Sequence, residues 1–463
     1  NAPGNFNDFS PAKLGRSENL IWSNPGITRS YLTGRRVDPT RLYYYHGGPC
    51  GGDVASGNFY PNHTPIQEVE DWMLEWSEKG DRLFFTVEGL LGTFNVDYEK
   101  GGVTYVTEYA ARLIGDTAYE GETDEYREYI SFKRPRLGTW GLDVGFYPRL
   151  DALRSEALLR GGRAWRFLGL PFNHWAGNIG VGSPSPDKSA FQWAASQLRL
   201  PTMAWIGGPE NEFSLKDHNF YAGETVEKTL LGIYDQPVGD ALWEARWELR
   251  EKASGKVAAE GRLSRKMSPY SRAKAPFRFR LPGAAAPVEY DLNLTVRDAA
   301  AGRPVAEDRF ALTAYPRPAP ASVAKSAPFF VFDPQGETTA WLNALGAATE
   351  PWPTGGAKRG GDGRVLALGR RALRGLKKLP FTAEDVAAGL RVVVFEQHCP
   401  ELDKIGFRHE DRSPRQVFVR RADHPLAAGL TAEALRDWQG HATLISEGPA
   451  GDRLAVSTRS FRI

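Results

Sequence analysis

The sequence predicts a multidomain protein in which a βα region, a β-sandwich and a small doubly wound α/β domain follow one another. Aromatic-rich strand candidates alternate with helical stretches up to about residue 209. Short strands of alternating polarity then run to residue 317, and apolar strands alternate with helices beyond it. Strands that alternate with helices are typical of parallel sheets, whereas evenly spaced short strands are typical of sandwiches. A chain of 463 residues is long enough for roughly two to four such domains.

The first region contains apolar and aromatic segments that predict strands at residues 41–46, 54–60, 83–88 and 164–170. A helix is expected between the second and third strands, because a capping box from Thr64 to Gln67 opens it and Gly80 follows its end. Its apolar side chains recur at helical spacing and predict a buried stripe made of Ile66, Val69, Met73 and Trp76.

The second region predicts an immunoglobulin-like β-sandwich over residues 213–317. Its expected strands are residues 225–234, 242–249, 256–263, 276–281, 288–296 and 307–314. The proline-rich segment 315–321 predicts a stiff linker.

The third region, residues 318–463, predicts a small doubly wound α/β domain of the flavodoxin or glutamine-amidotransferase type. Apolar strands are expected at residues 329–332, 364–368 and 390–395, with helices at 338–345 and 383–388 between them.

Charge and composition limit the classes of partner. Lys plus Arg number 58 and Asp plus Glu number 56, so no global field favours nucleic acid or an anionic membrane surface. No apolar run approaches the roughly 20 residues that span a bilayer, so no membrane insertion is expected. The 8 His and 2 Cys show no metal-ligand spacing, and neither a metal nor another cofactor is expected. We expect a neutral partner such as a carbohydrate.

Cys50 and Cys399 are the only cysteines and fall in different expected domains, so no disulfide framework is expected. Two cysteines do not identify the cellular compartment. We expect a periplasmic or extracellular location rather than a cytoplasmic one. The third domain is a candidate for homo-oligomer contacts. His424-Pro425 in that domain is interpreted as structural.

The segment from Arg82 to Gly89 carries the strongest indication of function. An apolar run ends in Glu88 and a glycine, the pattern of a buried parallel strand that delivers an acid at its carboxyl end. Barrel enzymes place their chemistry at such ends. His46, Asn58 and Tyr60 fall at corresponding ends of the preceding strands, so a barrel would gather them around one mouth. The glycine-rich loop 46–53 lacks a Lys-Ser/Thr ending and is interpreted as a loop that allows close backbone approach.

A resemblance to a known family adds to these observations. The ordered segments 38–41, 53–54, 58–60 and 87–89 resemble the second half of the (β/α)8 TIM barrel of the β-galactosidase, β-glucuronidase and β-mannosidase family of retaining glycoside hydrolases. The resemblance covers about the first 210 residues, and it implies that residues 1–212 are the C-terminal part of such a barrel. The later domains resemble accessory modules of multidomain members.

The resemblance implies roles for individual residues. Glu88 would be the nucleophile, and Tyr60 would orient it. The substrate-binding residues would be His46, Asp53, Asn58, His174 and Trp175. Two of these residues have an alternative interpretation. Trp175 could instead be a core aromatic residue, and His174 could be a capped histidine in a loop. The family's Asn-Glu acid pair is missing at the start of the chain, where Asp8 and Glu18 are the nearby carboxylates. We therefore expect a fragment of a longer enzyme that is weakly active or inactive alone.

Two alternatives remain open. The chain could be a carbohydrate-binding protein that has lost its acid. Alternatively, Cys399 could be a nucleophile in the third domain, although Pro400 follows it and no glycines flank it, which favours a buried structural thiol.

Overall fold

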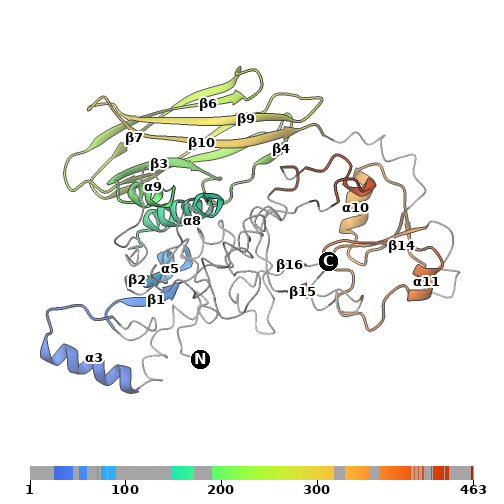
Figure 1. The fold of residues 1–463 in the computed structure, drawn as a ribbon, viewed down its shortest axis with the longest axis horizontal. Coiled ribbons are helices and arrows are strands. Elements are labelled where there is room, and N and C mark those ends of the chain that lie inside the picture. The colour runs from blue at the N-terminus through green and yellow to red at the C-terminus, as the bar shows by residue number, and fades with distance from the viewer. Residues whose placement is uncertain are drawn as a thin grey trace, which may run out of the picture. The chain divides into compact units, whose positions relative to one another are not determined.

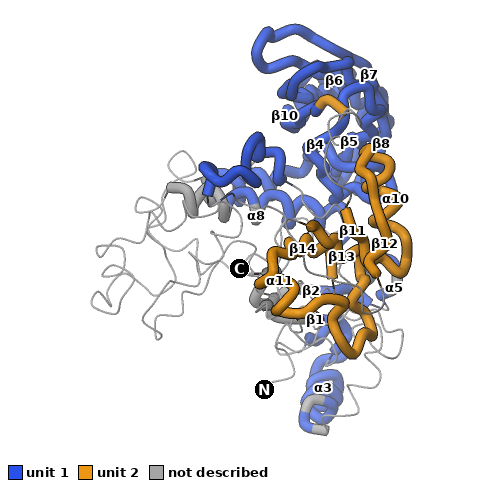
Figure 2. Tube along the Cα trace, turned by 90° about the vertical axis from the view of Figure 1, so that its right-hand side faces the viewer, with its two compact units in different colours: residues 1–315, 413–458 blue, residues 316–412, 459–463 orange. Residues whose placement is uncertain are grey.

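The chain divides into two units in the computed structural model, and each is described separately (Figure 1). Figure 2 shows the first unit, residues 1–315 and 413–458, and the second, residues 316–412 and 459–463, in different colours. The structure describes residues 25–44, 52–59, 70, 74–80, 82–89, 148–170, 190–317, 329–353, 364–397, 401, 405, 409–410, 419, 421–431, 433–436 and 460–461.

The first unit begins with α3 (Pro25–Val37), which is followed by two parallel strands, β1 (Ala55–Phe59) and β2 (Phe84–Gly89). Ala55 pairs with Phe84, and a parallel bridge joins Tyr44 to Val54. The prediction of successive parallel strands is confirmed for β1 and β2. A single strand pair does not define a barrel, so the part-barrel stays a prediction.

Within the described residues, this unit has three further α-helices: α5 (Leu74–Lys79), α8 (Pro148–Phe167) and α9 (Ala190–Gln197). The helix α5 lies inside the helical range expected from the capping box. The strand expected at residues 164–170 is wrong, because Ala164–Phe167 is the last turn of α8. The glycine pair 161–162 in mid-helix resembles a turn before a strand. A Cβ atom on Gly162 would lie 2.5 Å from the side chain of Leu198, so glycine lets α8 pack closely against the segment that ends α9.

Two sheets of mainly antiparallel strands follow and face each other across an apolar core (Figure 1). The larger sheet has the order β4-β10-β9-β6-β7, from β4 (Asn219–Tyr221), β6 (Ala241–Glu251), β7 (Val257–Met267), β9 (Val288–Asp298) and β10 (Arg303–Tyr315), with β10 and β4 paired in parallel. The smaller has the order β3-β5-β8, from β3 (Thr202–Gly207), β5 (Thr225–Tyr234) and β8 (Ser271–Arg280). Alternate residues of β6 are buried, and its Trp247 stacks on Phe277 of β8 at a centroid distance of 5.2 Å.

The smaller sheet is covered on both faces. Ile206 and Leu230 belong to the core between the sheets, whereas Trp205 and Leu231 pack with α8 and α9. Burial on both faces explains why β3 and the second half of β5, residues 230–234, are apolar without alternation. The strand β3 lies before the expected boundary at residue 213, yet it hydrogen-bonds to β5.

The second unit holds a parallel sheet of the order β12-β11-β13-β14. Its strands are β11 (Phe329–Phe332), β12 (Thr349–Pro351), β13 (Val365–Leu368) and β14 (Arg391–Val394), and its helices are α10 (Glu337–Ala344) and α11 (Ala383–Ala387). Counted along the chain this order is 2-1-3-4, which sheets of the flavodoxin type also have. Leu366 and Leu368 pack on one face and Ala367 on the other, so both faces of β13 are buried.

The remaining described elements are short. The antiparallel pair β15 (His409–Glu410) and β16 (Ser460–Phe461) belongs to the second unit. The 3-10 helix η7 (Pro425–Ala427) belongs to the first, and the ring of His424 caps it by accepting a hydrogen bond from the Leu426 N–H. This hydrogen bond is a structural contact of His424, and the segment belongs to the first unit and not to the expected third domain.

Candidate functional site

The carboxyl ends of β1 and β2 lie side by side, because the two strands are parallel neighbours. Asn58 is the penultimate residue of β1, and Glu88 is the penultimate residue of β2. The two residues that the sequence places at corresponding strand ends are therefore brought together by the backbone.

The register between the strands shifts at this point. Gly57 pairs with Thr86, but Phe59 pairs with Gly89. Two residues of β2, Val87 and Glu88, thus occupy the space that Asn58 alone occupies on β1. Irregularities of this kind are common next to active sites, where they change the direction of a side chain.

The other expected site residues divide into two groups. His46, Tyr60, His174 and Trp175 lie outside the described residues, as do Cys50 and Cys399. For Asn58 and Glu88 the structure describes the backbone alone. Asp53 is described in full.

Asp53 lies at the amino end of β1, opposite to the end that carries Asn58. One carboxylate oxygen accepts the Tyr31 hydroxyl at 2.8 Å, and the other accepts the Tyr43 N–H at 2.9 Å. Arg35 forms an ion pair with it at 3.9 Å. The structure therefore does not bring Asp53 together with Glu88, and the contacts of its carboxylate tie α3 to the start of the strand pair.

The same contacts set the charge of Asp53. Partial burial would raise the pKa of this carboxyl, but the hydrogen bonds from Tyr43 and Tyr31 and the charge of Arg35 lower it below its ordinary value. The hydrogen bond to Asp53 in turn raises the pKa of the Tyr31 phenol. Asp53 is thus ionised at neutral pH.

The end of the glycine-rich loop shows the close backbone approach that the sequence predicts. A Cβ atom on Gly52 would overlap the carbonyl oxygen of Tyr43. That oxygen accepts the Asp53 N–H at 2.8 Å. Only glycine fits this contact between the turn and the backbone of Tyr43.

A second cluster of charged groups, not expected from the sequence, surrounds Glu70. Its carboxylate accepts hydrogen bonds from Lys216 Nζ and Arg160 Nε, both at 2.7 Å. The side chains of Glu70 and Lys216 are only 2% and 5% exposed, so both charges are buried. The carboxylate of Glu70 is therefore ion-paired with two cations, and Glu70 is not a proton donor.

The pKa values of Glu70 and Lys216 are shifted by burial and by the charges around them, which are one carboxylate and several cations. Burial alone would raise the pKa of Glu70, but Lys216 and Arg160 outweigh burial and lower it. Burial lowers the pKa of Lys216, and repulsion from Arg160 and Arg163 adds to the effect although Glu70 opposes it. Arg163 also lies over the ring of Trp205, 5.2 Å from its centroid.

The sequence contains a sign of this cluster. Glu70 falls four residues after Ile66 and three before Met73, so it interrupts the expected apolar stripe of its helix. An acid on a buried face needs a cation close by. The pattern indicates that a partner exists but not that the partner is 146 residues away.

The described residues place no group of three or more His, Cys, Asp or Glu where a metal ion could be held. None of the helices in the described ranges combines the length and the apolar character that crossing a lipid bilayer requires.

Comparisons with known proteins give structural likenesses only. No protein-family model matches the chain, and no curated protein sequence matches it either. A family 123 glycoside hydrolase from Clostridium perfringens is similar over 29% of this chain and 30% of its own, at 10% identity and a TM-score of 0.19. A family 2 β-glucuronidase is similar over 24% of this chain and 11% of its own, at 8% identity and a TM-score of 0.16.

A CARDB domain from Pyrococcus furiosus, solved with two metal ions, is similar over 25% of this chain and 94% of its own, at 12% identity and a TM-score of 0.19. The matches cover less than a third of either glycoside hydrolase. At these TM-scores the likenesses establish neither a fold nor an activity for the chain.

Proposed function

We propose that this chain is a glycoside hydrolase that acts on β-linked glycosides by a retaining mechanism, with Glu88 as the nucleophile. The observation that supports the proposal is the position of Glu88 at the carboxyl end of β2, beside Asn58 of a parallel neighbour and within a shift of register. Parallel strands in barrel enzymes present their reactive groups at this end.

The chemistry requires an ionised carboxylate that attacks the anomeric carbon. A bond forms between a Glu88 oxygen and that carbon, while the bond to the leaving oxygen breaks and the leaving group departs with the electron pair. A hydrogen bond donated by the Tyr60 hydroxyl to Glu88 would favour the ionised form of this carboxyl and fix its direction. Water then hydrolyses the glycosyl-enzyme.

The proton donor of the first step has no assigned residue, so the test uses a substrate that does not need one. Incubation of the whole chain with 2,4-dinitrophenyl 2-deoxy-2-fluoro-β-galactoside, or its gluco, manno and glucurono counterparts, should trap a covalent adduct. Dinitrophenolate leaves without protonation, and the fluorine slows hydrolysis of the intermediate. We expect mass spectrometry of a digest to locate the adduct on Glu88.

The Glu88→Gln variant should form no adduct, because a neutral amide does not displace the leaving group. Glu78→Gln is the matched control, since Glu78 is an exposed carboxylate on α5, and it should form the adduct as the native chain does. An adduct on a different carboxylate, or none with any of the four sugars, would contradict the assignment. Sugar binding without any adduct would support the alternative, a non-catalytic carbohydrate-binding protein.

A further inference from the structure

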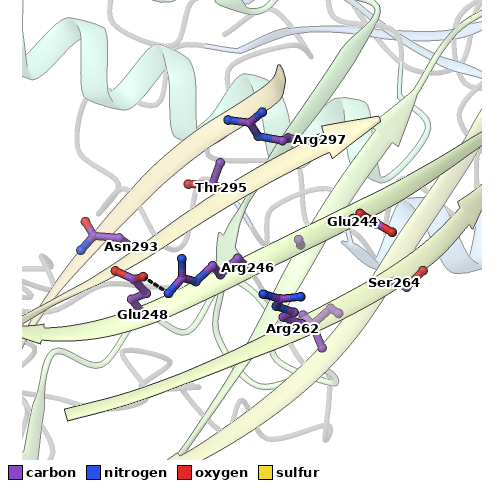
Figure 3. Close-up of a pocket in the computed structure, with 10 residues that line it drawn as sticks. Glu244, Arg246, Glu248, Arg262, Ser264, Asn293, Thr295 and Arg297 are labelled. Atoms are coloured by element: carbon purple, nitrogen blue, oxygen red, sulfur yellow. Dashed lines mark ion pairs between the residues drawn. The ribbon is translucent and has the colours of Figure 1, made fainter. Parts of the chain in front are cut away.

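The larger sheet of the sandwich has a polar hollow on the face that points away from the apolar core. Trp243, Ala245 and Trp247 of β6 point into the core, so Glu244 and Arg246, which alternate with them, point outward. Neighbouring residues of β7 and β9 complete a hollow of about 580 Å³ (Figure 3). Sites for small organic ligands commonly occupy roughly 300–1,000 Å³.

We propose that this hollow binds a short saccharide that carries a uronate carboxylate. The proposal concerns the sandwich and is independent of the activity assigned to Glu88.

The arginines of the hollow provide the first argument. Arg246 is paired with Glu248 at 2.6 Å and with Glu260 at 2.7 Å. The side chains of Arg262 and Arg297 are exposed and form no ion pair or hydrogen bond with any described residue. Arg262 also stands directly opposite Arg246 in the register of β6 and β7. Like charges at opposed positions repel, so an anion bound here would reduce the repulsion between Arg246 and Arg262.

The carboxylates of the hollow limit the kind of anion. Glu244 stands opposite Arg297 in the register of β6 and β9, yet the two side chains form no ion pair. Glu248 is engaged by Arg246 and Arg250. Two carboxylates within the hollow would repel the dense negative charge of several phosphates. Uronate carboxylates carry one charge each on separate sugar rings, and each can reach a guanidinium fork.

The remaining lining supplies groups for sugar hydroxyls. Ser264, Asn293 and Thr295 point outward around the arginines (Figure 3). Hydroxyl and amide groups donate and accept hydrogen bonds, and a carboxylate such as Glu244 accepts from hydroxyls. No aromatic side chain belongs to the described lining. Because neutral sugars are commonly held by stacking on aromatic rings, a lining without rings favours recognition through charge.

The test compares two disaccharides of matching size with the whole chain by isothermal titration calorimetry. Digalacturonate should bind at least about tenfold more tightly than galactobiose, because a carboxylate–arginine contact is a charge-assisted hydrogen bond. Added salt should reduce the difference. Equal affinities for the two sugars, or no binding of digalacturonate, would overturn the proposal.

Variants locate the site. The double variant Arg262→Gln, Arg297→Gln should lose about tenfold or more in digalacturonate affinity. Arg278→Gln is the matched control, because Arg278 is an exposed arginine of β8 in the other sheet, and it should bind as the native chain does. An unchanged double variant, or an equal loss in the control, would overturn the proposal. The double variant should form the covalent adduct on Glu88 as the native chain does, so this test and the test of the glycosidase activity can fail separately.

Discussion

Glu70 and Lys216 are 146 positions apart, and their side chains form an ion pair of 2.7 Å from which solvent is almost excluded. Arg160 of α8 donates to the same carboxylate oxygen. The contact joins the helical residue Glu70, the helix α8 and the segment before β4. The carboxylate of one part thereby compensates cations from two other parts of the first unit.

Replacing Glu70 by Gln should strongly destabilise the first unit. The amide leaves Lys216 and Arg160 buried without a counter-charge, and breaking a buried pair on one side costs roughly 3–5 kcal/mol. Urea unfolding followed by tryptophan fluorescence measures the loss. The control is Glu156→Gln, because Glu156 contacts the same Arg160 but is 53% exposed, and it should cost less than about 1 kcal/mol. Similar losses in the two variants would contradict the importance of burial.

The depressed pKa of Lys216 predicts a pH dependence. The folded chain releases this proton at about pH 7, whereas the unfolded chain holds it to the ordinary value of 10.5. The unfolded state therefore binds more protons in this window, and the contribution of Lys216 to the free energy of unfolding rises with pH. Between pH 7 and 10.5, the unfolding midpoint of the native chain should rise relative to that of Lys216→Met. Parallel pH curves for the two proteins would exclude the effect.

A methyl group at Gly232 should disturb the core between the two sheets. A Cβ atom there would lie 2.7 Å from the ring of Trp243, which is itself only 2% exposed and cannot easily move. Gly232→Ala should therefore destabilise the fold by about 1–3 kcal/mol. Gly283→Ala is the control, since a methyl group at that position would have no described atom within 4 Å, and its thermal unfolding should match the native chain.

Gln397 offers a test in the second unit. It is 4% exposed, donates to the carbonyls of Gly369 and Phe395, and accepts the Leu373 N–H. Gln397→Glu would bring an ionised oxygen against a carbonyl and should cost at least about 3 kcal/mol at neutral pH. Acidic pH should reduce the loss, because a protonated carboxyl again has a donor.

The neighbouring Glu396 provides the control for that variant. Its carboxylate is 45% exposed and contacts Arg370 at 3.0 Å. Glu396→Gln should leave the unfolding transition almost unchanged. Equal effects at the two positions, or a loss in Gln397→Glu that does not depend on pH, would show that the amide contacts matter little.

Local patterns were sufficient for many elements. The bounds of β5 and β11 coincide with the strands expected at residues 225–234 and 329–332, because periodicity and apolar runs show which side chains a strand buries. The sequence also predicts the position of Glu88 at a strand end, because an apolar run stops there. The same reasoning failed at residues 164–170, where a glycine pair inside α8 resembles a turn.

Amino-acid order alone thus indicated where strands and helices form and that Glu88 ends a parallel strand. The pairing of β3 with β5, the shift of register beside Asn58 and the contact between Glu70 and Lys216 were decided only by the folded chain. The physical reason is that the local pattern of polar and apolar residues indicates which side chains are buried. The residue that a buried side chain or strand contacts depends on segments that are distant along the chain.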